Sequence, residues 1–303
     1  MKGLLTKDYF YDAEKAREYL EKMRWSNGVV CPHCGSLEAY KLEAKEGSKN
    51  PVRNGVYKCK SCRKQFTVTV GTIFEDSHIA LNKWLMAIQL LCSSKKGMSA
   101  HQLHRMLGVT YKSAWFMAHR IRYAMTQPPV VGKLQGIVEA DETYIGGKAH
   151  GKRGRGAANK TPVFALVERG GKVRTFKTKA VTAKNLQEKI RENVDKKAIV
   201  MTDEFLAYKG LDAEFEHHTV NHGSGEYVNG NDYTNTAEGF FSILKRGING
   251  VYHHVSEQHL DRYLAEFCFR YDNRKVDDAV RCGLALGQTE GKRLTYKEHS
   301  PVN

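Results

Sequence analysis

The sequence predicts an α+β protein of several domains: a small cysteine-rich module, a helical domain and a domain built on a mixed β-sheet. Two C-x-x-C pairs lie near the start, helical patterns follow them, and short apolar runs typical of strands begin near residue 134. The 303 residues exceed what one core usually fills, which favours two or three domains.

Charge and composition narrow the class of protein further. The chain has 48 Lys and Arg against 33 Asp and Glu, a net charge of +15, which favours a polyanionic partner. No apolar run approaches the about 18 residues that a membrane span needs. The first residues, MKGLLTKDYF, lack the long apolar segment and cleavage site of a secretory signal. We therefore expect a cytoplasmic protein of a bacterial, nucleoid-associated kind, with no membrane partner.

Cysteine spacing gives the strongest local signal. Cys31 and Cys34 form CPHC, and Cys59 and Cys62 form CKSC. Two such knuckles are typical of a zinc ribbon, in which four thiolates close a tetrahedral structural Zn²⁺ site with no open position for catalysis. Two disulfides would fit an intracellular chain poorly. The other three cysteines are interpreted as small buried hydrophobes: Cys92, Cys268 and Cys282.

A helical domain is expected next. Apolar residues at helical spacing predict helices over 81–92 and 100–107, and a third helix after the turn at Gly108. This is the outline of a helix-turn-helix, whose third helix would enter a major groove, although a plain three-helix bundle with a basic face has the same pattern. The third helix is expected to expose its cations, of which Lys112 and Arg120 are candidate DNA contacts: Lys112, His119, Arg120 and Arg122.

The third domain follows a break at 127–129. Strands are predicted over 132–145, 161–170, 171–178 and 198–203, with a possible strand at 217–222; helices are predicted over 182–193 and from about 236. This order is that of an RNase H-like nuclease fold, in which a mixed sheet packs between helices. The first and fourth strands lie side by side in that fold.

Three acids fall at positions suited to a divalent-metal site. Asp141 and Asp203 end two apolar strand runs, and Glu238 opens the last long helix. If they converge, they form a clamp for phosphodiester chemistry. Glu139 has the same strand parity as Asp141 and is a minor contender, while Asn235 followed by Glu238 also fits a helix cap.

Two further acids are expected to face away from the metal site. Glu142 and Glu204 each directly follow a catalytic candidate, so alternation along a strand turns them to the opposite face. A glycine-rich segment after Asp141 carries three clustered cations, named here the basic loop: Lys152, Arg153 and Arg155. It is expected to follow a phosphate backbone, the alternative being a solvated hairpin tip.

Several stretches resemble the DDE transposases of bacterial insertion sequences, in particular the ISXO-type family with an N-terminal zinc ribbon. They are VEADETYIGGK, MTDEFLAYKGL, VNHGSGEYV and TNTAEGFFSILKRGINGVYHHVSEQHLDRYLAEFCFRYDNRK, and the resemblance covers nearly the whole chain. It implies that Asp141, Asp203 and Glu238 are the three catalytic acids. Lys245 matches the basic residue beyond the third acid, and Lys245 with Arg246 is expected to contact DNA.

The resemblance also implies an activity. Two Mg²⁺ or Mn²⁺ ions held by the three acids would support cleavage at the ends of the element, and the freed 3′ ends would then join target DNA. Double-stranded DNA is the implied partner, bound by a homodimer or larger synaptic assembly. Two alternatives remain: a structure-specific nuclease of the same fold, and a zinc-ribbon DNA-binding regulator with an inactive nuclease-like domain. The predicted domains are an N-terminal helical segment (1–26), zinc ribbon (27–75), helix-turn-helix-like domain (76–127), catalytic domain (128–285) and C-terminal tail (286–303).

Overall fold

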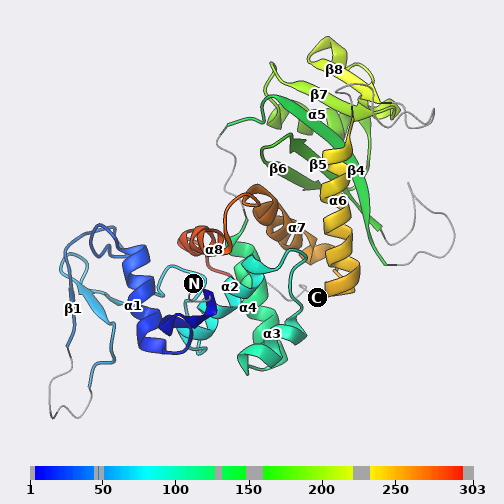
Figure 1. Cartoon of the computed structure of the whole chain (residues 1–303). Helices are drawn as coiled ribbons and strands as arrows, with labels where there is room; N and C mark the ends of the chain where they lie inside the picture. The colour runs from blue at the N-terminus through cyan, green and yellow to red at the C-terminus, as the bar shows by residue number, and fades with distance from the viewer. Residues whose placement is uncertain are drawn as a thin grey trace. The chain divides into compact units, whose positions relative to one another are not determined.

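The computed structural model describes residues 4–43, 47, 51–126, 132–147, 160–220 and 233–295. Within these ranges the chain forms two compact units (Figure 1). Unit 1 contains the described parts of 1–94, 100–125 and 277–303, and unit 2 those of 95–99 and 126–276. No helix in the described part of the chain is long and apolar enough to cross a membrane.

Unit 1 begins with short 3₁₀ turns, a capped helix and a small antiparallel sheet. Its first helix begins at Ala13 because the Asp12 carboxylate accepts hydrogen bonds from the free N–H groups of Glu14 and Lys15. The sheet has the order β1-β2-β3. The first cysteine pair lies at a turn before β1, and the second pair lies at the end of β2 and in the turn that follows it. The elements are the 3₁₀ turns Leu4–Thr6 and Asp8–Phe10, α1 (Ala13–Arg24), β1 (Ala39–Lys41), β2 (Tyr57–Cys59) and β3 (Gln65–Phe66).

The rest of unit 1 is helical and is closed by the C-terminal part of the chain. Its helices are α2 (Leu81–Ser93), α3 (Ala100–Leu107), α4 (Tyr111–Ala124) and α8 (Asp278–Gly287). Thr110 caps α4 by accepting from Ser113 N. Arg281 of α8 donates to the carbonyl of Cys92, which ties α8 to α2. Residues 277–285 therefore group with unit 1, whereas the sequence assigned them to the catalytic domain.

Unit 2 is built on a five-stranded mixed sheet with the order β6-β5-β4-β7-β8. The first three strands pair antiparallel as a meander, and β7 and β8 pair parallel to β4 and β7 respectively. This is an RNase H-like arrangement, with the first and fourth strands side by side as the sequence predicts. The strands are β4 (Ile137–Gly146), β5 (Lys160–Glu168), β6 (Val173–Lys177), β7 (Ile199–Asp203) and β8 (Glu216–Val220).

Helices cover both faces of this sheet (Figure 1). On one face, Val138, Ala140 and Val200 pack against α5 and the turns after β7. On the other, Ile145 and Val163 pack against α6 and α7. The connecting elements are α5 (Ala183–Asn193), the 3₁₀ turns Leu206–Tyr208 and Leu211–Ala213, α6 (Asn235–Gly247), the π-helical segment Ile248–Tyr252 and α7 (Glu257–Asp272). Along β4, side chains of even-numbered residues therefore point to the α5 face of the sheet, and those of odd-numbered residues point to the α6 face.

Candidate active site and metal centre

The four predicted zinc ligands lie together in unit 1. Their sulfur atoms are all within 4.8 Å of one another, with Cys31 Sγ 3.7 Å from Cys62 Sγ and Cys34 Sγ 3.6 Å from Cys59 Sγ. A tetrahedral zinc site with Zn–S bonds of ~2.3 Å requires S···S separations of ~3.8 Å. The N–H of Cys62 lies 3.5 Å from Cys59 Sγ and lowers the pKa of that thiol, which favours the thiolate that binds metal. The cluster fits a structural zinc ribbon.

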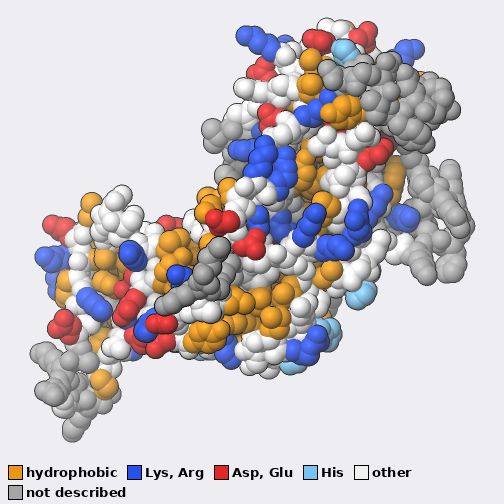
Figure 2. Space-filling model, viewed as in Figure 1, with side chains coloured by type: hydrophobic (Ala, Val, Ile, Leu, Met, Phe, Trp, Pro, Cys, Tyr) orange, Lys and Arg blue, Asp and Glu red, His pale blue; other side chains and the backbone are white. Residues whose placement is uncertain are grey.

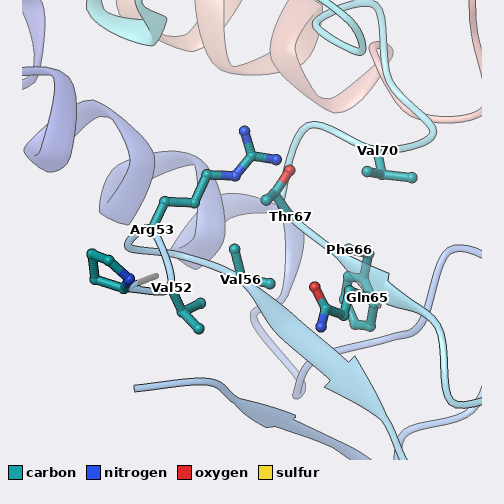
Figure 3. A pocket seen from close by; sticks show the side chains of 8 residues that line it. Val52, Arg53, Val56, Gln65, Phe66, Thr67 and Val70 are labelled. Atoms are coloured by element: carbon teal, nitrogen blue, oxygen red, sulfur yellow. The ribbon is translucent and has the colours of Figure 1, made fainter. Parts of the chain in front are cut away.

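A cavity of about 370 Å³ lies beside the sheet of this ribbon (Figure 3). It is lined by Val52, Arg53, Val56, Phe66 and other residues of the segments around β2 and β3. The lining mixes apolar and polar side chains and contains a single cation, Arg53. It offers no set of metal ligands or nucleophiles, so it does not form a second chemical site.

Asp141 and Asp203 lie on neighbouring parallel strands. The register of β4 and β7 pairs Glu139 with Met201, so two residues further along each strand the two aspartates are level. By the alternation of side chains along each strand, both aspartates belong to the α6 face of the sheet. The Asp203 carboxylate accepts the N–H of Phe205, which orients it at the end of β7.

The electrostatics of Asp141 indicate that acids converge around it. Burial, together with the charges of Glu142, Asp203 and Glu238, raises its pKa to about 7, although the N–H of Glu142 opposes this rise by donating to the carboxylate. Among the described residues, the four cysteines are the only group of ligand side chains gathered closely enough to hold one metal ion, and the three acids are not gathered in that way. Carboxylates that bind two ions need not be mutually that close. The arrangement is a partly buried concentration of negative charge that a divalent cation would neutralise.

Glu238 lies in the first turn of α6, on the exposed side of that helix. Lys245 lies seven residues on, which is about two helical turns, and is exposed on the same side. Arg246 is also exposed and donates to Ser242 Oγ one turn earlier. Figure 2 shows Lys and Arg side chains gathered over the part of unit 2 where α6 and α7 lie. Helix α6 therefore carries one acid and two cations on its solvent side.

The acids that flank Asp141 occupy opposite faces of the sheet. Glu142 accepts a hydrogen bond from Tyr208 Oη over 2.8 Å, on the face packed against α5, as alternation predicts. Glu139 is fully buried on the α6 face and ion-paired with Arg169. Its two oxygens also bind the start of α6. Sequence reasoning missed this role, and the only available signal was the parity that Glu139 shares with Asp141.

The prediction that α4 exposes its cations is wrong for three of the four residues named. His119, Arg120 and Arg122 are buried, at 0%, 5% and 2% exposure. Arg120 donates to the carbonyls of Ile73, Glu75 and Leu294, so its guanidinium is hydrogen-bonded to backbone oxygens of unit 1. The physical reason is that segments distant in the chain surround the C-terminal half of α4.

The other predicted DNA contacts divide into two groups. Lys112, in the first turn of α4, is exposed. In a helix-turn-helix the N-terminal residues of the recognition helix contact base edges, and this is the role that the sequence predicts for Lys112. The basic loop, Lys152, Arg153 and Arg155, lies outside the described residues.

Two family patterns match the chain. The ISXO2-like transposase domain matches residues 133–272, and the transposase zinc-ribbon domain matches residues 12–65. A protein in transposable element ISH50 of Halobacterium salinarum is 33% identical over 279 residues, which covers 86% of this chain and 91% of the relative. A transposase-like protein of Haemophilus influenzae is 31% identical over 110 residues, covering 36% of this chain and 88% of the relative.

Solved structures with detectable similarity include two Mos1 transposase complexes. The Mos1 strand transfer complex is 15% identical and covers 70% of this chain and 79% of its own, with a TM-score of 0.28. The Mos1 paired-end complex with the left transposon end is 14% identical and covers 68% and 74%, with a TM-score of 0.27.

Proposed function

The chain belongs to the ISXO2-like transposases, and from this premise we propose that it cleaves the ends of an insertion sequence and joins them to target DNA in one metal-dependent active site. The observation that carries the proposal is the convergence of charge at Asp141. Its pKa is raised to about 7 by burial and by the charges of Glu142, Asp203 and Glu238. A raised pKa of this origin is typical of carboxylates grouped for function.

In this proposal Asp141, Asp203 and Glu238 hold the divalent cations. Mg²⁺ or Mn²⁺ bound there supplies Lewis-acid stabilisation of the charge that develops on the phosphate oxygens. Asp141 must lose its proton to act as a ligand, and Phe205 N keeps the Asp203 carboxylate in one orientation. Lys245 and Arg246, on the exposed side of α6, are suited to bind the phosphates on either side of the cut bond.

The ribbon and the helical part of unit 1 are proposed to bind the terminal repeats. The four cysteines would hold a structural zinc that folds the ribbon, because so small a sheet has little core of its own. The exposed first turn of α4, with Lys112, is the part available for a major groove. Two ends must be brought together for joining, so we propose a homodimer or larger assembly on double-stranded DNA, in the cytoplasm beside the nucleoid.

The test is cleavage and joining of DNA that carries the element's own ends, in the presence of Mg²⁺. Asp203→Ala and Glu238→Gln are expected to lose both steps by several orders of magnitude while retaining end binding, because these acids serve as metal ligands. Asn235→Ala is the matched control on the same helix turn. It should retain activity, since Glu139, a residue of β4, accepts the N–H groups at the start of α6.

Each outcome assigns a function. Cleavage without joining, and without preference for the element's ends, would favour the structure-specific nuclease. End binding without any cleavage by the wild type would favour the regulator. Near wild-type cleavage by Asp203→Ala, or a larger loss for Asn235→Ala than for Glu238→Gln, would refute the proposed set of acids.

A further inference from the structure

A buried carboxylate outside the proposed set of acids binds the helix that carries one of them. Glu139 of β4 is 0% exposed, and its Oε2 accepts the N–H groups of Thr236 and Ala237 over 2.8 and 2.9 Å. Its Oε1 accepts the Thr236 hydroxyl over 2.8 Å and Arg169 Nε over 2.6 Å. Four donors thus occupy the two oxygens, which leaves no position for a metal ion and removes Glu139 from the contenders for that role.

These contacts replace an ordinary helix cap. The residue before α6, Thr234, makes no side-chain cap hydrogen bond. The first turn of a helix has N–H groups without helical partners and a partial positive charge, both of which a carboxylate satisfies. Here the cap comes from strand β4, 97 residues earlier in the chain than Thr236. The start of α6 is therefore attached to the strand that carries Asp141.

Arg169 extends this attachment to the segment before the helix. Besides Glu139, it donates through Nη2 to the carbonyl of Tyr233 over 2.7 Å, and its guanidinium lies 3.5 Å from the centre of the Tyr233 ring. The backbone N–H of Arg169 donates to the carbonyl of Ile137, at the beginning of β4. Both the chain entering α6 and the first turn of α6 are thus held to one strand by one ion pair.

We propose that Glu139 is a positioning residue that fixes the first turn of α6 to β4 and so holds Glu238 beside Asp141. Glu238 directly follows Ala237, whose N–H Glu139 binds, and Asp141 lies two residues after Glu139 on the same face of the strand. Any shift of the helix start changes the separation of the two proposed ligands. The inference rests on the proposed function for the role of those two acids.

The variant that tests it is Glu139→Gln in the full-length protein. The amide keeps the size of the side chain but can accept at one atom only, and it loses the charge that binds Arg169. Its matched control is Glu266→Gln on α7, which also removes a fully buried carboxylate paired with an arginine, Arg270. Glu266 accepts hydrogen bonds from Tyr252 and Arg270, which lie outside the first turn of α6 and are not among the three acids. The control therefore reports the general cost of losing a buried ion pair.

Three measurements separate positioning from general stability. Hydrogen exchange without DNA follows the first turn of α6, Mn²⁺ binding is measured by electron paramagnetic resonance, and cleavage is measured over a Mg²⁺ series. For Glu139→Gln we expect faster exchange in that turn and a loss of about 10–100-fold in Mn²⁺ affinity, the usual effect of removing a group that orients a ligand. The Mg²⁺ concentration for half-maximal cleavage should rise in parallel, with unchanged affinity for end DNA. Glu266→Gln should leave the affinity for both ions near the wild-type value.

Several results would overturn the proposal. One is a Glu139→Gln protein with wild-type Mn²⁺ affinity, and another is an equal loss in Glu266→Gln. If Glu139→Gln does not fold, Thr236→Val removes one donor to the carboxylate and should shift both metal measurements in the same direction by a smaller factor; no shift would count against the proposal. If the wild type binds Mn²⁺ but does not cleave DNA, the proposed function fails, while exchange and Mn²⁺ affinity still decide whether Glu139 positions the helix.

Discussion

Replacing Asp141 by asparagine should stabilise the metal-free catalytic unit at high pH. The pKa of Asp141 is about 7 in the folded chain, raised by burial and neighbouring acids from the ordinary value of 3.8. The folded state therefore holds the proton more tightly than the unfolded state, and stability falls as pH rises between these two values. Each pH unit corresponds to about 1.4 kcal/mol, so the loss between pH 5 and pH 7 is at most about 3 kcal/mol. Asparagine carries no charge and avoids this loss.

Tryptophan fluorescence would report on unit 1, because all three tryptophans, Trp25, Trp84 and Trp115, lie in that unit. The stability of unit 2 must therefore be measured by another method. Hydrogen exchange is measured in the β4 and β7 peptides of Asp141→Asn and wild type, at each pH and without added divalent ions. Comparing the two proteins at the same pH cancels the intrinsic effect of pH on exchange. The protection of the variant relative to wild type should grow from pH 5 to pH 7 and then level off. Mg²⁺ added at pH 8 should protect the wild type and leave the variant nearly unchanged. A protection ratio that is constant with pH, or that falls, would refute the assignment of repelling charge to this site.

Other predictions concern the ribbon, the DNA contacts and the packing of α6. Cys59→Ser should release one zinc per chain, seen by elemental analysis, and unfold the ribbon while exchange in β4 and β7 stays unchanged; wild type lacking zinc would remove the premise. Alanine at the three cations of the basic loop should weaken binding to all DNA and lower the salt slope by about one unit per lost contact. Alanine at Lys112 should instead cost about 1–3 kcal/mol on terminal-repeat DNA and less on random DNA, and the reverse pattern would interchange the two roles. Gly247→Ala should cost unit 2 about 1–3 kcal/mol in chemical denaturation, because its Cβ would lie 2.7 Å from the carbonyl of Lys96. A variant as stable as wild type would show that α6 can shift.

Local patterns predicted the parts of this chain that depend on neighbours in sequence. The two C-x-x-C pairs fix four thiolates on two turns, and the structure brings all four within 4.8 Å. The helix predicted over 100–107 has these bounds in the structure, and the helix predicted over 81–92 extends one residue further. The adjacency of the first and fourth strands was also predicted, because strands followed by a helix, a strand and a second helix have the order of an RNase H-like fold.

Tertiary packing decided which cations are available on α4. Helical periodicity identifies one apolar face but does not show what covers the remaining faces. In the structure, Arg120 donates to Leu294, 174 residues away, and Lys292 donates to the carbonyl of Ala124. The residues predicted to be a C-terminal tail thus contribute to the packing of unit 1. A charged side chain that reaches distant carbonyls cannot be told from an exposed one by spacing alone.

The acids of β4 mark the same division between sequence and structure. By itself the sequence determined that Glu139 and Asp141 share one face of a strand, because side chains alternate with a period of two. Both positions therefore suit a metal ligand. Only the tertiary structure distinguishes their surroundings, since it brings Arg169 and the N–H groups at the start of α6 against Glu139 and leaves other carboxylates around Asp141. A carboxylate surrounded by donors is neutralised by the protein itself, whereas one surrounded by other acids is left to bind a proton or a cation.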